Sequence, residues 1–346
     1  MARSPAQPQD LSDKDRERLK KYLHNNPKAF TVVTVPPSRK RKRASPNLHT
    51  ETNLAQERLA VEYEIKPANN WESLRRYKKF TGMRKDLREL GDESIAAGEH
   101  ILVKHEDTGD QEGDIVDYAA QWKAKVLEVR ALDSENVFVR VAWHNRPEDL
   151  ESGRKAYHGK NELIPTNQLD IIDAMSVNGK LDVYDWEEEN DDSPMPDPQE
   201  YFWRQTLDSA NTNTFSKLRL MCRDQTPQNP DEVIIQCGNA KCRSWLHAKC
   251  IAEDALERAI EAQAPVGKKR KSAGSTQKNG GPRQPKMSPS ATAMAASKDG
   301  SLMAEFFIAD LPADRPADKT EIVITDAAGE TRSEEMKCLL CSETLD

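Results

Sequence analysis

The sequence is poor in the apolar residues from which a large hydrophobic core is built. Only 36% of its 346 residues are hydrophobic and 6% are aromatic, whereas 32% are charged. No apolar stretch approaches the roughly 18 residues of a membrane span, and the first residues lack the apolar segment of a secretory signal. We therefore expect an intracellular protein without membrane association, with a modest core and long exposed flanks.

Patterns typical of catalytic sites are also missing. The sequence has no nucleophile and base grouping, no phosphate-cradling glycine loop and no HExxH pattern of catalytic zinc. The net charge of −7 argues against a general nucleic-acid coat. Two basic runs, residues 39–43 and 268–271, are interpreted as nuclear import signals, with solvated charge or nonspecific phosphate contact as the alternatives. We expect a nuclear, non-catalytic protein that does not bind DNA sequence-specifically.

No cysteine lies outside one ordered series, which it shares with a single histidine. Thiolate and imidazole at these separations suit tetrahedral structural zinc, and closely spaced cysteines in a reducing compartment are more often metal ligands than disulfides. The interleaved order predicts a cross-brace, in which the first and third ligand pairs hold one zinc and the second and fourth hold another. The series is Cys222, Cys237, Cys242, His247, Cys250, Cys338 and Cys341.

Composition divides the chain into segments and predicts a mainly β protein with a small helical content. Residues 1–60 are expected to form a disordered basic arm with a short helix over 11–23, and residues 61–98 lead into the first domain. Short alternating apolar runs over 99–186 predict a small β-barrel or sandwich, and an acidic linker with an extension of this domain follows over 187–220. Residues 221–346 hold the cysteine series, a helix over 252–262, a disordered insertion at about 263–300 and strand-like runs at 302–308 and 321–325.

The order of motifs resembles that of a known family of chromatin proteins. The stretches AKVLEV (124–129), VFVRVAW (137–143), RPED (146–149) and HGKNEL (158–163) resemble a bromo-adjacent homology (BAH) domain. The stretches NPD (229–231), IIQC (234–237) and WLH (245–247), followed by Cys250, resemble the plant homeodomain (PHD) finger fused behind it. The tandem is similar to the fungal and plant BAH-PHD proteins of repressive chromatin. The resemblance implies a BAH β-barrel over residues 99–186 and a PHD-like finger over residues 221–346.

In this cross-brace, a complete four-thiolate set would hold one zinc ion, and this is the firmer of the two predicted sites. Its members are Cys237, Cys242, Cys338 and Cys341. The other zinc would take Cys222, His247 and Cys250. The family usually has a cysteine two residues after the first ligand, and here that residue is Asp224. Either the Asp224 carboxylate completes the site, or this zinc is weak or absent and Cys222 is an ordinary buried thiol.

The resemblance also implies a site for methylated lysine, which is recognised by aromatic faces around the cation. The three family positions correspond to Trp122, Trp143 and Asn145, so two aromatic walls are present and one is open. Tyr118 or His144 is a candidate to cover the open side. The alternative is that both tryptophans only pack. In the finger, Trp245 matches a common cage wall, although the other wall positions lack tyrosines.

The leading hypothesis is a nuclear chromatin reader that binds the histone H3 tail or nucleosome, with its BAH domain recognising a repressive Polycomb-type lysine methylation. The second hypothesis is a degenerate scaffold that joins a chromatin-associated complex through protein contacts and reads no mark; Asn145 and Asp224 favour it. A RING-like ubiquitin ligase shares the cross-brace, but the step from Cys237 to Cys242 and the position of Trp245 fit the finger better.

Overall fold

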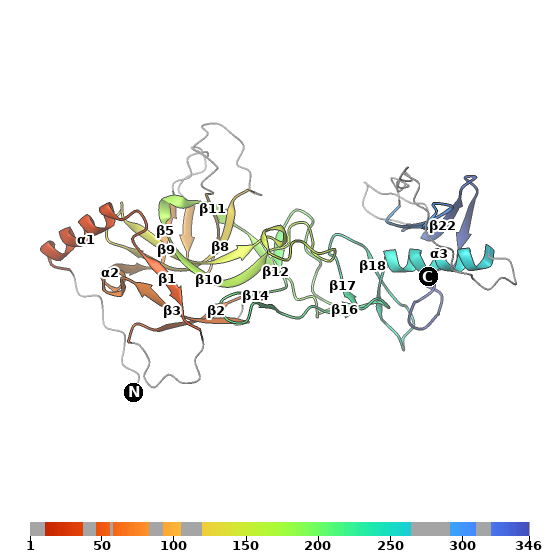
Figure 1. Ribbon diagram of the computed structural model, residues 1–346, viewed down its shortest axis with the longest axis horizontal. Coiled ribbons are helices and arrows are strands. Elements are labelled where there is room, and N and C mark those ends of the chain that lie inside the picture. The colour runs from red at the N-terminus through yellow and green to blue at the C-terminus, as the bar shows by residue number, and fades with distance from the viewer. Residues whose placement is uncertain are drawn as a thin grey trace, which may run out of the picture. The chain divides into compact units, whose positions relative to one another are not determined.

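The computed structural model describes residues 11–36, 46–55, 58–82, 93–104, 120–263, 291–308 and 320–345. The chain forms two compact units (Figure 1). The first comprises Met1–Lys155 and Lys160–Leu218, and the second comprises Ala156–Gly159 and Arg219–Asp346. The fold is mainly β, as the sequence predicted. No helix in the described ranges is long and apolar enough to cross a membrane.

The first unit is built on an eight-stranded sheet whose central strands are β8 and β9. Alternate residues of β9 enter two cores: Val139 and Val141 pack on one side of the sheet, and Phe138 and Ala142 pack on the other. This alternation follows from the two-residue period of a strand. In sheet order the strands are β11 (Val177–Leu181), β7 (His100–Val103), β8 (Trp122–Ala131), β9 (Val137–Asn145), β10 (Ile164–Asp173), β14 (Leu207–Asp208) and β15 (Thr214–Phe215), with β4 (Arg75–Tyr77) paired to β8.

The described residues 11–36, 46–55 and 58–60 are folded, which corrects the expectation of a disordered arm for this part of residues 1–60. Helix α1 (Asp13–Asn25) is followed by a three-stranded sheet in the order β1-β3-β2, and α2 then leads to β4. Leu19 and Leu23, one helical turn apart, are buried, and the Phe30 ring makes edge contacts at centroid distances of 5.2 Å with Trp71 and 5.1 Å with Phe138. The buried apolar residues of α1, β2, β3 and α2 enter one core. The basic run 39–43 lies outside the described residues. The bounds are β1 Thr31–Thr34, β2 His49–Leu54, β3 Leu59–Lys66 and α2 Ala68–Glu72.

The remaining elements of the first unit are short. Strands β5 and β6 pair with each other, and β12 pairs in parallel with β13. Immediately after β13, Arg204 forms buried ion pairs with Glu162, at 3.1 Å, and with Glu188, at 2.6 Å. The acidic stretch after residue 187 is thereby tied to this unit. The bounds are β5 Lys79–Gly82, β6 Glu93–Ala96, β12 Val183–Asp185, β13 Tyr201–Trp203, and the 3-10 helices Pro147–Asp149 and Ala174–Ser176.

The second unit consists of a helix, a meander sheet and two small hairpins. Helix α3 (Ala248–Gln263) packs on the antiparallel sheet β20-β21-β22-β23, as Figure 1 shows beside β22. Phe306 and Ile322 of this sheet and Ile251 of α3 are fully buried in one core. The expected insertion at 263–300 is corrected at its end, because β20 lies within it; residues 264–290 are outside the described ranges. The strands are β16 (Leu220–Met221), β17 (Thr226–Pro227), β18 (Ile234–Gln236), β19 (Trp245–His247), β20 (Ala293–Ala296), β21 (Leu302–Phe307), β22 (Glu321–Asp326) and β23 (Thr331–Glu334).

Candidate metal sites and aromatic site

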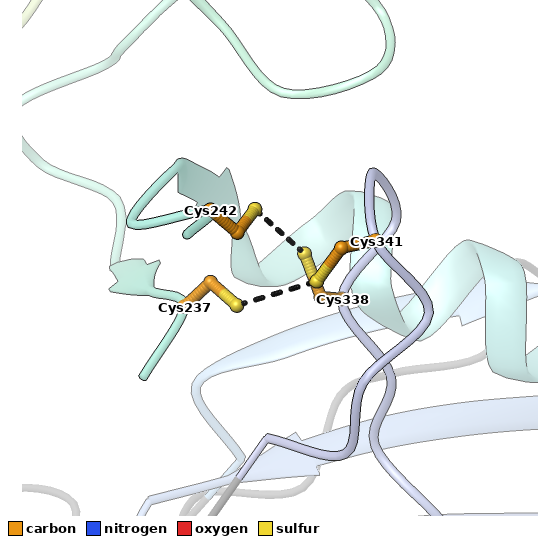
Figure 2. Close-up of side chains that lie close together, drawn as sticks. All are labelled: Cys237, Cys242, Cys338 and Cys341. Atoms are coloured by element: carbon orange, nitrogen blue, oxygen red, sulfur yellow. Dashed lines mark hydrogen bonds between the residues drawn. The ribbon is translucent and has the colours of Figure 1, made fainter. Parts of the chain in front are cut away.

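Four cysteines from two distant segments of the chain converge in the second unit (Figure 2). Cys237 and Cys242 lie between β18 and β19, and Cys338 and Cys341 follow β23. Their sulfur atoms all lie within 4.8 Å of one another, with Cys237 Sγ 3.7 Å from Cys341 Sγ and Cys242 Sγ 3.8 Å from Cys338 Sγ. Zinc–sulfur bonds of about 2.3 Å place tetrahedral sulfurs about 3.8 Å apart. The donor set therefore fits a zinc ion, and all six cysteines are free of disulfide bonds.

Backbone hydrogen bonds hold both cysteine-bearing turns of this set. Arg243, with a φ of 47°, donates its N–H to the carbonyl of Asn239, and Ser342, with a φ of 62°, donates to the carbonyl of Cys338. A left-handed residue next to a ligand folds the chain back, so both sulfurs of a turn face one point. The Ser244 hydroxyl, 3.3 Å from Cys242 Sγ, lowers the pKa of that thiol to about 7, which favours the thiolate form that binds metal.

A second donor set contains the aspartate that replaces the expected cysteine. Cys222 follows β16, Asp224 lies in the turn to β17, His247 ends β19 and Cys250 lies in the first turn of α3. Their ligand atoms all lie within 4.8 Å of one another. His247 Nδ1 is 3.5 Å from Asp224 Oδ1 and 3.7 Å from Cys250 Sγ, and Cys250 Sγ is 3.5 Å from Asp224 Oδ2. Tetrahedral zinc with N, O and S ligands separates these atoms by about 3.4–3.6 Å, so the set fits zinc.

Hydrogen bonds and charge lower the pKa of two members of this second set, Cys222 and Asp224. Contact with Cys250 and then with His247 lowers the pKa of the Cys222 thiol to about 4. Burial acts to raise the pKa of Asp224, but the hydrogen bond from the Thr226 hydroxyl, at 2.7 Å, and the nearby His247 hold it below its ordinary value. Thr226 was missed from the sequence; the Asp-x-Thr spacing of a local side-chain turn was the available signal.

The predicted aromatic site lies at the end of the central strand pair of the first unit. The Trp122 and Trp143 rings are 6.2 Å apart between centroids, with an interplanar angle of 60°. Trp122 is 41% exposed, whereas Trp143 is half-buried and packs against the core. Because Lys123 pairs with His144 in the antiparallel register, the next pair outward is Trp122 and Asn145. Trp122, Trp143 and Asn145 therefore share one face of the sheet.

Of the other predicted wall residues, His144 is described in the same unit and does not lie on this face. His144 points to the opposite side, where it is buried with its ring centroid 5.0 Å from that of His100, so it cannot cover the open side of the pair. Burial lowers the pKa of His100 to about 4 and holds that of His144 well below its ordinary value. Tyr118 lies outside the described residues. Trp245 is in β19 of the second unit, where it is half-buried against the core around α3.

A β-rich domain followed by a cross-braced module with two metal-donor sets defines the class of BAH-PHD proteins. A family model described as BAH domain matches residues 93–219. The chain is 30% identical over 159 residues to the chromatin remodeling protein SHL of Arabidopsis thaliana, which covers 43% of this chain and 68% of SHL. It is 27% identical over 163 residues to the chromatin remodeling protein EBS of the same plant, which covers 45% of this chain. The chain belongs to the BAH-PHD family of chromatin proteins.

The matches cover parts of the chains compared. The chain spans 62% of the length of EBS. Among solved structures, the yeast Rsc2 BAH domain is similar over 41% of this chain and 54% of its own, with 14% identity and a TM-score of 0.27, a likeness too low to support a conclusion.

Proposed function

We propose that this protein is a non-catalytic nuclear chromatin reader that binds the histone H3 tail through methyl-lysine. Its BAH domain would recognise a repressive, Polycomb-type lysine methylation, and its partners would be nucleosomes and a chromatin-associated complex. Membership of the BAH-PHD family supports the chromatin role. The names of the two plant relatives, both chromatin remodeling proteins, support the same role.

The observation that carries the methyl-lysine proposal is the pair of tryptophans at one sheet edge. Their centroids are 6.2 Å apart at an angle of 60°, so one cation can lie within the about 6 Å of both rings that a cation–π contact needs. Trp122 keeps 41% of its surface exposed, although burying that surface in a core would stabilise the fold. An exposed aromatic next to a second ring favours ligand contact over packing alone.

Peptide titration tests this proposal. Full-length protein is titrated with unmodified and methylated H3 tail peptides, and Trp143→Ala is expected to weaken the methylated complex by about 2- to 30-fold, the equivalent of one cation–π contact of about 0.5–2 kcal/mol. Trp122→Ala removes the exposed wall and is expected to have a similar effect. Tyr77→Ala is the matched control, because Tyr77 in β4 is an equally exposed aromatic, at 42%. Equal affinity for methylated and unmodified peptides would refute the proposal.

We further propose that two zinc ions stabilise the second unit, one in each donor set. The spacing of the ligand atoms, within 4.8 Å in both sets, supports this assignment. The residues would hold the metal as a structural element, with no open position for chemistry. Metal analysis of purified protein is expected to find two zinc ions per chain.

The scaffold role is the second candidate, and Asn145 favours it. The open wall at this position weakens the case for reading a mark, while the folded β domain still offers a surface for a partner protein. Affinity capture of the double variant Trp122→Ala/Trp143→Ala distinguishes the two. A stable chromatin complex recovered at the same yield as with the unchanged protein would support the scaffold over the reader.

A further inference from the structure

Asn145 brings a hydrogen-bonding side chain to the tryptophan pair. It ends β9 two residues after Trp143 and lies across from Trp122 in the register. Directly opposed residues of an antiparallel pair have Cβ atoms about 4.5–5.5 Å apart, so Asn145 lies beside Trp122 on the sheet face that also carries Trp143. Its backbone is held by pairing with Ile164 of β10. Among the residues that the structure describes, its half-buried amide has no hydrogen-bond partner.

The methyl states of lysine differ in what they can offer to such an amide. Trimethyl-lysine has no N–H, whereas dimethyl-lysine keeps one N–H and most of the methyl surface that contacts aromatic rings. The asparagine carbonyl oxygen accepts a hydrogen bond, and hydrogen bonds to charged groups are stronger than neutral ones. A trimethylammonium group would instead remove this oxygen from water without donating a hydrogen bond to it, which is unfavourable.

We infer that the Trp122–Trp143 site selects dimethyl-lysine over trimethyl-lysine, with Asn145 as the residue that determines the methyl state. The two tryptophans provide the cation–π contacts that all methyl states share. The Asn145 oxygen accepts a hydrogen bond from the N–H that dimethyl-lysine keeps and trimethyl-lysine lacks. This inference rests on the proposed methyl-lysine reading and specifies its ligand. The expected preference is about tenfold in Kd, equivalent to about 1.4 kcal/mol.

The test uses the full-length protein and H3 tail peptides in which one lysine at a time is unmodified, dimethylated or trimethylated. For the lysine that binds, the dimethyl peptide is expected to bind about tenfold more tightly than the trimethyl peptide. Asn145→Leu keeps a similar shape but removes the acceptor, so the ratio of the two Kd values is expected to fall to about one. Asn145→Tyr adds the third aromatic wall and is expected to shift the preference to trimethyl-lysine.

Two outcomes overturn the inference while leaving methyl-lysine reading in place. One is equal or tighter binding of the trimethyl peptide by the unchanged protein, and the other is a dimethyl preference that persists in Asn145→Leu. Matching thermal unfolding of Asn145→Leu and the unchanged protein shows that a changed ratio does not arise from misfolding. If no methylated peptide binds more tightly than its unmodified form, the proposed reading and the inference both fall.

Discussion

One substituted ligand makes the two donor sets chemically unequal. The first set contains four cysteine sulfurs, whereas the second contains two cysteine sulfurs, an imidazole and the Asp224 carboxylate. Carboxylate is a harder ligand than thiolate, and zinc is bound most firmly by sulfur and nitrogen in structural sites. His247 would bind a metal through Nδ1, which faces the other donors, and its Nε2 is buried without a hydrogen-bond partner among the described residues. The second set also lacks this outer support, which normally strengthens a histidine ligand.

Replacing Asp224 by cysteine is therefore expected to strengthen metal binding. In competition with a chromogenic chelator, the unchanged protein should release its two zinc ions in two steps, the first from the set that contains Asp224. Asp224→Cys should slow or weaken that first release by about tenfold or more, since a thiolate replaces a carboxylate. Asp231→Cys, in the same unit but outside both sets, controls for an added thiol. Release in a single step that Asp224→Cys does not change would contradict the expected inequality.

The elements differ in how far the sequence could predict them. The runs at 124–129, 137–143 and 321–325 lie in β8, β9 and β22, and the run at 302–308 exceeds β21 by one residue. Alternating β-branched and aromatic residues mark such strands directly. Strands β20 and β23 were missed, since alanines and polar residues carry no such period. The core role of α1 was missed because its two buried leucines are surrounded by charge. They belong to a core that also contains Trp71 and Phe138, which are distant in sequence.

The closeness of the metal ligands was predicted more completely than the aromatic site. A metal ion needs ligands at a few characteristic spacings along the chain. The grouping of ligands can therefore be predicted from the order and spacing of the cysteines. The surroundings of His144 depend on what covers each of the two faces of β9, and that is decided by tertiary packing. Trp143 and His144 were both predicted to line the aromatic site. Because adjacent residues of a strand point to opposite faces, the alternation along β9 already indicated that only one of them could do so.

The facing histidines of β7 and β9 make the stability of the first unit dependent on pH. Burial, and then Lys125, lowers the pKa of His100 to about 4, and Asp182 opposes this shift. Burial, and then His100, holds the pKa of His144 well below its ordinary value. Both are neutral in the folded state, whereas in the unfolded chain they bind protons below a pKa of about 6.5. Between pH 6.5 and 4 the unfolded state therefore binds more protons, and stability falls as the pH falls.

Urea unfolding at pH 7.5 and 5.5, followed by tryptophan fluorescence, measures this effect. The free energy of unfolding is expected to be lower at pH 5.5 by about 1 kcal/mol for each histidine. The variant His100→Gln/His144→Gln has no titrating ring at this position, so the difference between the two pH values should shrink by about 2 kcal/mol whatever its absolute stability. An unchanged difference in this variant would assign the pH dependence to other groups.

The whole molecule joins two units whose stability has different origins. The cores of the first unit contain no cysteine and are formed by aromatic and branched aliphatic residues. The core of the second unit includes three of the predicted ligands, Cys222, Cys237 and Cys338. Its two small hairpins have only two or three residues per strand, which is too short for independent stability. Metal binding is therefore expected to supply much of the folding free energy of the second unit and little of the first.

Removal of metal is accordingly expected to unfold the second unit selectively. Structural zinc contributes apparent free energies of about 10–16 kcal/mol, comparable to the whole stability of a domain, so a unit that depends on two such ions cannot remain folded without them. Hydrogen exchange read by mass spectrometry, before and after incubation with a strong chelator, should show lost protection over residues 219–263 and 320–345. Residues 120–150 should keep their protection, because the core around β8 and β9 contains none of the predicted metal ligands. Re-addition of zinc should restore the pattern, which separates metal loss from irreversible damage.

Retained protection across the second unit after complete zinc removal would show that α3 and its sheet fold without metal. The two donor sets would then have to serve a purpose other than holding the fold.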